Sequence, residues 1–418
     1  MEYSVIAIGD ELLIGQVTDT NSGWIARRLT PAGWRQRTVR VIGDSAEAIR
    51  GALDASLAEA DVVLMTGGLG PTRDDITKQV LCDYFGGELR LDEAVARNVE
   101  AIFAKRGLTM NAPTASQAMV PTSCRVIQNR VGTAPIMWFE RDGKVVVSMP
   151  GVPFEMQAAM DDSVVAELLR RFPSREAIEH RTLVVAGVAE STLSLRLEEF
   201  EDSLPAEVHL AYLPDQGLIR LRLSGESPDR AWLTATMERL VCRLDELLGD
   251  AIVSHADVPL SQILGELLAE RGLTLATAES CTGGNIAHEI TAIAGSSRYF
   301  AGGVVAYSNA VKRSVLGVDG DVLEAHGAVS GPVVEAMARG VRRRLGTDCA
   351  IATSGIAGPG GAVPGKPVGT VWIAASVGEK VEAECYHFPG SRERVIYRAT
   401  LTALVMLIRL VRAYRKNN

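Results

Sequence analysis

The chain has 418 residues, of which 47% are hydrophobic, so it can bury the cores of two to four domains. Its 43 lysines and arginines are outnumbered by 51 aspartates and glutamates, and the net charge of −8 argues against broad binding to nucleic acid or to anionic membranes. The six cysteines form no CxxC pair, which favours a reduced, cytoplasmic protein without a structural zinc.

The first 168 residues alternate strand-like and helix-like segments. The pattern predicts strands at 3–8, 38–42 and 62–65 and helices at 22–29 and 46–60. Because the apolar segment 3–8 leads directly into Gly9–Glu11, we expect a strand there and no signal peptide. Such alternation is typical of an α/β doubly wound parallel sheet.

Acidic and glycine-rich turns follow these strands. The segment 66–75, TGGLGPTRDD, matches neither GxGxxG nor GxxxxGK[ST], so it predicts neither a dinucleotide fingerprint nor a P-loop. A glycine turn that enters a helix still offers backbone N–H groups to a phosphate, and adjacent aspartates can hold a divalent ion. The strand at 145–149 ends in a similar turn at 150–155. We therefore expect one site at this edge of the sheet rather than separate ordinary loops.

The segment 175–252 is predicted to be a separate α+β unit. Its pattern indicates a strand at 181–188, a helix at 190–200, a hairpin of 208–213 with 217–223 around Pro214–Gln216, and a helix at 229–248. A turn-rich linker near 254–259 separates this unit from the last third of the chain.

A hydroxyl lies on a strand-to-helix turn in that last third. An apolar run at 273–278 predicts a buried strand, Ser280 follows it, and a helical pattern begins at 286. A serine nucleophile with an oxyanion site needs such a turn, although a serine before a helix is often only an N-cap. Cys281 is the rival nucleophile, but its position turns it away from the glycines.

Lys312 is the best base candidate for Ser280. It follows a predicted strand at 303–307, so a parallel sheet would bring it to the same carboxyl edge. A desolvated lysine there can lose its proton and act as a base, with Tyr307 as a relay. A third buried strand at 349–352 opens onto hydroxyls and glycines from Thr353 onward. The apolar helix at 399–411 is too short to span a bilayer and is predicted to be a core or interface helix.

The motifs together resemble full-length members of the CinA family. AESCTGG at 278–284, YSNAVK at 307–312, ATSGIAGP at 352–359 and FPGSR at 388–392 resemble the C-terminal amidase domain of that family. GDELLIGQ, DTN, TGGLGPTRDD and PGVPFE resemble its N-terminal MoaB/MogA-like, or molybdopterin-binding, domain. The middle unit resembles its KH-type subdomain. The expected domains are 1–168, 175–252 and 256–418.

This resemblance implies a bifunctional enzyme of pyridine-nucleotide salvage. The C-terminal domain would hydrolyse the carboxamide of nicotinamide mononucleotide without a cofactor, and the N-terminal domain would hydrolyse ADP-ribose with a divalent metal ion. For the amidase it implies catalytic Ser280, Lys312, Tyr307 and Thr353 and substrate-binding Gly283, Gly284, Ser354, Gly355 and Arg392. For the N-terminal domain it implies substrate-binding Asn21, Thr66, Gly67, Gly68, Gly70 and Thr72 and metal ligands Glu11, Asp19, Asp74, Asp75 and Glu155.

Departures from the family pattern leave alternatives open. Ser116 replaces the usual lysine of the N-terminal domain, so its pyrophosphatase activity is expected to be weak or lost, and Ser391 replaces an aspartate. The turn 187–190 lacks the second glycine of a GXXG loop, so we expect the middle unit to be a spacer or a dimerisation unit. This unit and the apolar helix at 399–411 favour a homodimer, and the net charge predicts binding neither to nucleic acid nor to a membrane. One alternative is a non-catalytic nucleotide- or pterin-binding adaptor in competence or DNA-damage response. Another is a Ser/Lys peptidase or β-lactam hydrolase, which is disfavoured because no lysine follows Ser280 by three residues.

Overall fold

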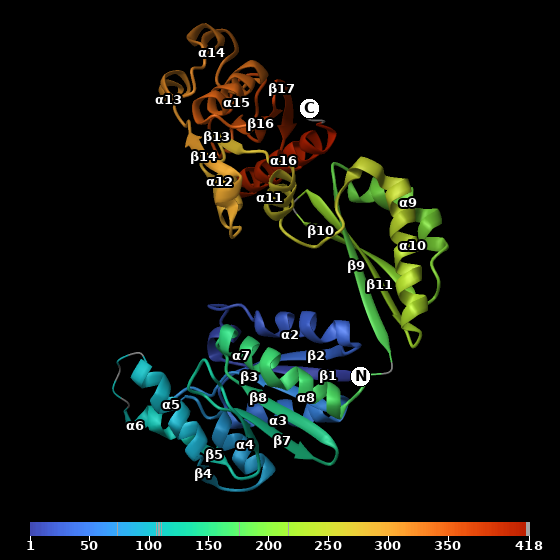
Figure 1. Ribbon diagram of the computed structural model, residues 1–418, viewed down its shortest axis with the longest axis vertical. Coiled ribbons are helices and arrows are strands. Elements are labelled where there is room, and N and C mark those ends of the chain that lie inside the picture. The colour runs from blue at the N-terminus through green and yellow to red at the C-terminus, as the bar shows by residue number, and fades with distance from the viewer. Residues whose placement is uncertain are drawn as a thin grey trace. The chain divides into compact units, whose positions relative to one another are not determined.

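The computed structural model describes residues 1–72, 74–105, 107, 109, 111–174, 176–215 and 217–414 (Figure 1). They divide into two compact units. The first holds Met1–Glu179 with Gly225–Thr236, and the second holds His180–Ser224 with the chain from Met237 onward.

The first unit is built on a six-stranded sheet in the order β2-β1-β3-β8-β7-β6. The strands are β1 (Glu2–Ile8), β2 (Arg35–Ile42), β3 (Val62–Thr66), β6 (Arg125–Ile127), β7 (Ile136–Arg141) and β8 (Lys144–Met149). The first three and β8 are parallel, as predicted, but β6 and β7 are antiparallel. The turn Asp142–Gly143, with both residues at positive φ, joins β7 to β8, and a two-residue hairpin can only join antiparallel strands.

Helices cover both faces of this sheet. One face carries α2 (Asn21–Leu29), α7 (Pro153–Ala159) and α8 (Val165–Arg171), and the other carries α3 (Ala46–Glu59) and α4 (Thr77–Phe85). The remaining elements of this unit are α1 (Asp10–Leu13), η1 (Thr30–Ala32), β4 (Leu89–Leu91), α5 (Glu93–Lys105), α6 (Ala112–Ala115), η2 (Ser116–Ala118), β5 (Met119–Pro121) and η3 (Met160–Val164). Burial of the near-continuous apolar strands between two helix layers explains why the sheet has this doubly covered form.

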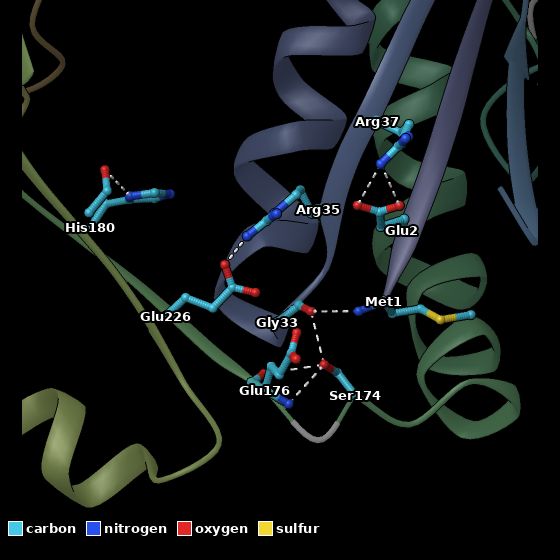
Figure 2. A network of polar contacts seen from close by, with 10 residues as sticks. Met1, Glu2, Gly33, Arg35, Arg37, Ser174, Glu176, His180 and Glu226 are labelled. Atoms are coloured by element: carbon cyan, nitrogen blue, oxygen red, sulfur yellow. Dashed lines mark hydrogen bonds and ion pairs between the residues drawn. The ribbon is translucent and has the colours of Figure 1, made fainter. Parts of the chain in front are cut away.

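The start of the chain is tied to the segment that follows α8, as Figure 2 shows. The carbonyl of Gly33 accepts a hydrogen bond from the Ser174 hydroxyl at 2.9 Å and from the Met1 amino group at 3.4 Å (Figure 2). These contacts hold the first strand where the chain leaves the N-terminal domain.

The middle segment forms a four-stranded sheet in the order β10-β11-β9-β12. Its elements are β9 (Ala177–Ala186), α9 (Glu190–Asp202), β10 (Val208–Asp215), β11 (Leu218–Ser227), α10 (Arg230–Leu248), η4 (Gly249–Ala251) and β12 (Ile252–Ser254). Every predicted element is present, but Pro214 and Asp215 still belong to β10, and Gln216 lies outside the described residues.

The C-terminal domain has a five-stranded sheet in the order β14-β13-β15-β16-β17. Its elements are α11 (Leu260–Arg271), β13 (Leu275–Glu279), α12 (Asn285–Thr291), η5 (Ser296–Arg298), β14 (Phe300–Val305), α13 (Asn309–Ser314), α14 (Gly320–His326), α15 (Gly331–Leu345), β15 (Cys349–Gly355), β16 (Thr370–Val377), β17 (Lys380–His387) and α16 (Arg392–Ala413). Since β14, β13 and β15 are parallel neighbours, their carboxyl ends meet at one edge, as predicted.

The helix α16 is a core element of the C-terminal domain. It is longer than the predicted helix, and Ala399, Leu404 and Leu407 are buried against the sheet. Within the described part of the chain, no helix is long and apolar enough to cross a membrane.

Candidate functional site

Ser280 and Lys312 lie together at the edge where the three parallel strands end. The Nζ of Lys312 donates a hydrogen bond to the Ser280 hydroxyl at 3.0 Å. Ser280 follows β13 directly, and Lys312 lies in α13, whose first turn is capped by the Ser308 hydroxyl. The turn after β14 therefore brings a lysine 32 residues away in sequence into contact with the serine.

Burial prepares Lys312 to act as a base. The side chain is 1% exposed, and its Nζ also donates to the backbone carbonyls of Ala306 at 2.7 Å and Tyr307 at 3.5 Å. Because desolvation disfavours the ammonium form, the pKa of Lys312 is lowered from that of an ordinary lysine. A neutral amine can then accept the proton of Ser280.

Glu279 fixes the turn that carries Ser280. This glutamate is 1% exposed, and its carboxylate accepts hydrogen bonds from the N–H groups of Gly284 and Ile286 at 3.0 Å and of Ala287 at 2.9 Å. It therefore caps the N-terminus of α12. Glu279 was not among the predicted site residues, although an acidic residue just before a helix is a signal for a cap.

The hydrogen bonds of the turn decide which N–H groups can face a substrate. The N–H of Gly283 donates to the Ser280 carbonyl at 3.2 Å, and that of Gly284 donates to Glu279. In the described part of the chain, the N–H groups of Cys281 and Thr282 donate to no carbonyl or carboxylate. Gly283 and Gly284 thus supply the positive φ that the turn needs. The N–H groups that could stabilise an oxyanion are those of Cys281 and Thr282.

Thr353 and the side chain of Cys281 are buried at this turn. The Thr353 hydroxyl is fully buried and lies 2.7 Å from the hydroxyl of Thr282, a residue that the sequence analysis missed. Burial raises the pKa of the Cys281 thiol to about 12, so the thiol is protonated at neutral pH. A protonated thiol is a poor nucleophile, which favours Ser280.

The remaining predicted amidase residues separate into two groups. Arg392, at the start of α16, donates to the Tyr307 hydroxyl at 3.0 Å and to the Gly358 carbonyl at 2.9 Å. Tyr307 is 61% exposed, so its phenol lies at the mouth of the site beside Arg392, and Lys312 contacts only its carbonyl. Ser354 and Gly355 belong to β15 and not to the predicted loop, and the Ser354 hydroxyl donates to the Ala328 carbonyl. Because strand side chains alternate, Ser354 faces away from Thr353.

The first unit has a second candidate site, a cavity of about 530 Å³ at the carboxyl ends of its parallel strands. Every residue predicted for the N-terminal site lines it, namely Glu11, Asp19, Asn21, Thr66, Gly67, Gly68, Gly70, Thr72, Asp74, Asp75 and Glu155. A Cβ on Gly67 would come within 2.1 Å of the Ile8 carbonyl oxygen, so the close packing of this turn requires glycine.

The carboxylates of this cavity hold its loops. Asp19 accepts the N–H groups of Asn21 and Ser22 at 3.0 and 3.1 Å, Asp75 accepts those of Gly70 and Thr72 at 2.7 and 3.0 Å, and Glu155 accepts the Asn129 amide at 2.7 Å. Among the described residues, no group of three or more histidine, cysteine, aspartate or glutamate side chains is arranged to hold a metal ion. The predicted ligands therefore line one cavity but do not form a metal centre in this conformation.

A lysine lies close to the position where the family lysine is replaced. Lys78 of α4 donates to the backbone carbonyls of Ser116 and Gln117, both at 3.2 Å, and burial lowers its pKa to about 8. Thus the chain has a cation near Ser116, but it comes from another helix and is bonded to the backbone.

Three family models match consecutive parts of the chain. The model described as the probable molybdopterin binding domain matches residues 4–170, the damage-inducible protein CinA KH domain matches 180–254, and the CinA C-terminal domain matches 257–411. The first match agrees with the predicted MoaB/MogA-like fold.

Relatives match over nearly the whole length. CinA-like proteins from Cytophaga hutchinsonii and Flavobacterium psychrophilum are 42% and 41% identical to this chain. The first alignment covers 97% of this chain and 96% of the relative, and the second covers 100% of both. A crystal structure of a competence-damaged protein (CinA) superfamily protein from Klebsiella pneumoniae is 39% identical, covers 37% of this chain and 97% of its own, and has a TM-score of 0.37.

Proposed function

Because the chain belongs to the CinA family, we propose that its C-terminal domain is a serine amidase that converts nicotinamide mononucleotide to nicotinate mononucleotide and ammonia. The 3.0 Å hydrogen bond between Lys312 and Ser280 is the observation that carries this proposal. A lysine with a lowered pKa beside a serine hydroxyl is the minimum that a Ser/Lys hydrolase needs.

The reaction proceeds in two steps. Neutral Lys312 takes the proton of Ser280, and the Ser280 oxygen attacks the carboxamide carbon. The N–H groups of Cys281 and Thr282 stabilise the oxyanion, an effect of about 3 kcal/mol per donor. The tetrahedral intermediate collapses as the Lys312 ammonium protonates the leaving nitrogen, which departs as ammonia. In the second step, Lys312 takes a proton from water, and the resulting hydroxide attacks the ester. The Ser280 oxygen leaves and receives the proton from Lys312.

Arg392 recognises the phosphate of the substrate in this proposal. Its guanidinium lies at the mouth of the site, at the N-terminus of the 22-residue helix α16. An arginine and a helix N-terminus both favour a phosphate dianion. Tyr307 orients Arg392 through its hydroxyl, and Thr353 supports the oxyanion turn through Thr282.

The test is ammonia release from nicotinamide mononucleotide by the full chain in the presence of EDTA. We expect release by the wild type and by Cys281→Ser and none by Ser280→Ala. Release by Ser280→Ala, or loss of release in Cys281→Ser with the fold retained, would overturn the assignment of the nucleophile. If the wild type releases no ammonia, the amidase proposal fails.

We also propose that the N-terminal cavity binds ADP-ribose. The glycine turn and Asn21 line the same cavity, which supports this proposal. The Oδ1 of Asn21 is buried and has no hydrogen-bond partner among the described residues. Because the carboxylates do not form a metal centre, we derive no hydrolytic step there. Calorimetry with ADP-ribose tests binding, and hydrolysis of its pyrophosphate bond with and without added Mg²⁺ separates an enzyme from a nucleotide-binding adaptor.

A further inference from the structure

A cavity of about 260 Å³ runs along α16, and none of the residues that line it belongs to either candidate site. We call it the α16 groove. Residues of α16 from Arg398 to Arg409 form its floor, β17 and Phe388 form one wall, and the turns at Gly187 and Gly217 form the other. All of these residues belong to the second compact unit.

Two arginines of the groove have no acidic partner in the part of the chain that the structure describes. The Nε of Arg398 is shielded from solvent and has no hydrogen-bond acceptor among the described residues. Arg409 donates through one Nη to the Ala186 carbonyl at 2.9 Å. Neither takes part in any ion pair of the described residues. A buried donor without an acceptor is unfavourable, and an anionic ligand would satisfy it.

The acidic residues of the groove are already engaged. Glu382 forms an ion pair with Lys380 at 2.7 Å, and Glu384 accepts a hydrogen bond from the Tyr386 hydroxyl. Lys380 offsets the charge of Glu382, while Glu384 keeps its negative charge, so the two arginines leave one positive charge without a counterpart in the groove. The groove favours a ligand that brings its own negative charge.

The part of the groove between the arginines suits a flat ring. Leu401, Val405 and Met406 line it and are each at most 9% exposed. The rings of Tyr386 and Phe388 stack at 5.7 Å with an interplanar angle of 5°, and the Arg398 guanidinium lies 5.2 Å from the centre of the Phe388 ring. Aromatic and apolar surfaces of this kind bind planar groups.

The two charges stand at opposite ends of this surface. Arg398 and Arg409 are eleven residues apart on α16, which corresponds to about 16 Å between their Cα atoms, and both side chains are long enough to reach inward. A ligand with an acidic group at each end and a flat ring between them satisfies both arginines. A ligand with a single acidic group satisfies only one.

We propose that the α16 groove is a binding site for an organic dianion that has a flat ring and an acidic group at each end, and that it prefers the product of the amidase to its substrate. The product, nicotinate mononucleotide, carries a ring carboxylate in addition to its phosphate, whereas the substrate carries a neutral amide in that place. The choice of this ligand rests on the proposed function. The groove shares α16 with Arg392, and Thr400 of the same helix accepts a hydrogen bond from Asn285 of α12 at 3.0 Å.

Titration calorimetry on the full chain tests this site, with Ser280→Ala as the background so that no turnover occurs. We expect two sites for nicotinate mononucleotide and one for nicotinamide mononucleotide. Arg398→Gln should weaken the second site at least tenfold, and Thr402→Trp, which fills the groove, should remove it. Arg344→Gln, an exposed arginine of α15, is the matched control and should change nothing.

A single site for both compounds would overturn the proposal, as would a second site that survives both groove variants. Ammonia release is measured separately, so the two proposals fail in different ways. A second site that depends on Arg398 in a protein without amidase activity leaves the groove as a dianion site and removes only its link to the product. Ammonia release by a protein that shows a single binding site would support the amidase and overturn the groove.

Discussion

Glu279→Gln tests how the turn that carries Ser280 is held. In the structure one carboxylate oxygen accepts the N–H groups of Gly284 and Ile286 and the other accepts that of Ala287. An amide has one acceptor oxygen, and its NH₂ group would face at least one backbone N–H. At least one hydrogen bond to a buried charge is lost, and such a bond contributes about 1.5 to 3 kcal/mol.

This loss should appear both in stability and in rate. We expect the free energy of unfolding to fall by about 2 kcal/mol, at the lower end of that range for one bond. We also expect kcat for ammonia release to fall about a hundredfold with little change in KM, because the oxyanion donors Cys281 and Thr282 are displaced together.

The assays are thermal unfolding and steady-state ammonia release, with labelling of Ser280 by a fluorophosphonate as a readout that does not require the natural substrate. Glu324→Gln, an exposed glutamate of α14, is the matched control. A folded Glu279→Gln protein that is less stable but keeps its kcat and its labelling rate would refute the reasoning, since Glu279 would then hold α12 without positioning the oxyanion donors.

Three other predictions follow from single residues. Because the pKa of Lys312 is lowered, amidase activity should rise with pH and reach half of its maximum below about pH 10.4. The unfolded chain binds the proton of this lysine more tightly, so the free energy of unfolding should rise with pH between the folded and unfolded pKa values. A pH–rate profile of the wild type that shows no such rise would contradict the prediction. Arg392→Gln should raise KM at least tenfold for nicotinamide mononucleotide but not for nicotinamide riboside, which lacks the phosphate, and equal effects on both would exclude phosphate recognition. Asp75→Asn should weaken ADP-ribose binding, because Asp75 holds the N–H groups of Gly70 and Thr72, whereas Asp83→Asn on the surface of α4 should not.

Much of the fold could be predicted because its signals are local. Continuous apolar runs such as 62–65 and 349–352 indicate buried strands, and the glycine turns after them indicate where strands of a parallel sheet end. The glycine turns after these strands therefore indicated where both candidate sites lie. The antiparallel edge of the first sheet could have been predicted too, since Asp142–Gly143 is a hairpin signal.

The roles of individual atoms depend on contacts that the spacing of residues along the sequence does not predict. The sequence identified Gly283 and Gly284, but whether their N–H groups face a substrate was decided by Glu279 and the Ser280 carbonyl. In the same way, the family resemblance implied metal ligation by the aspartates of the N-terminal motifs, and the folded chain adds that Asp19 and Asp75 accept backbone N–H groups.

Residue types and their order thus determined the succession of strands and helices, the sheet edges and the polar groups available at each edge, because periodicity and turn chemistry act over a few residues. Only the tertiary structure decided which groups meet. The contact of Lys312 with Ser280, the bond between Arg392 and Tyr307 and the groove along α16 all join residues far apart in the chain. Their geometry comes from how strands and helices pack, and packing is a property of the whole fold.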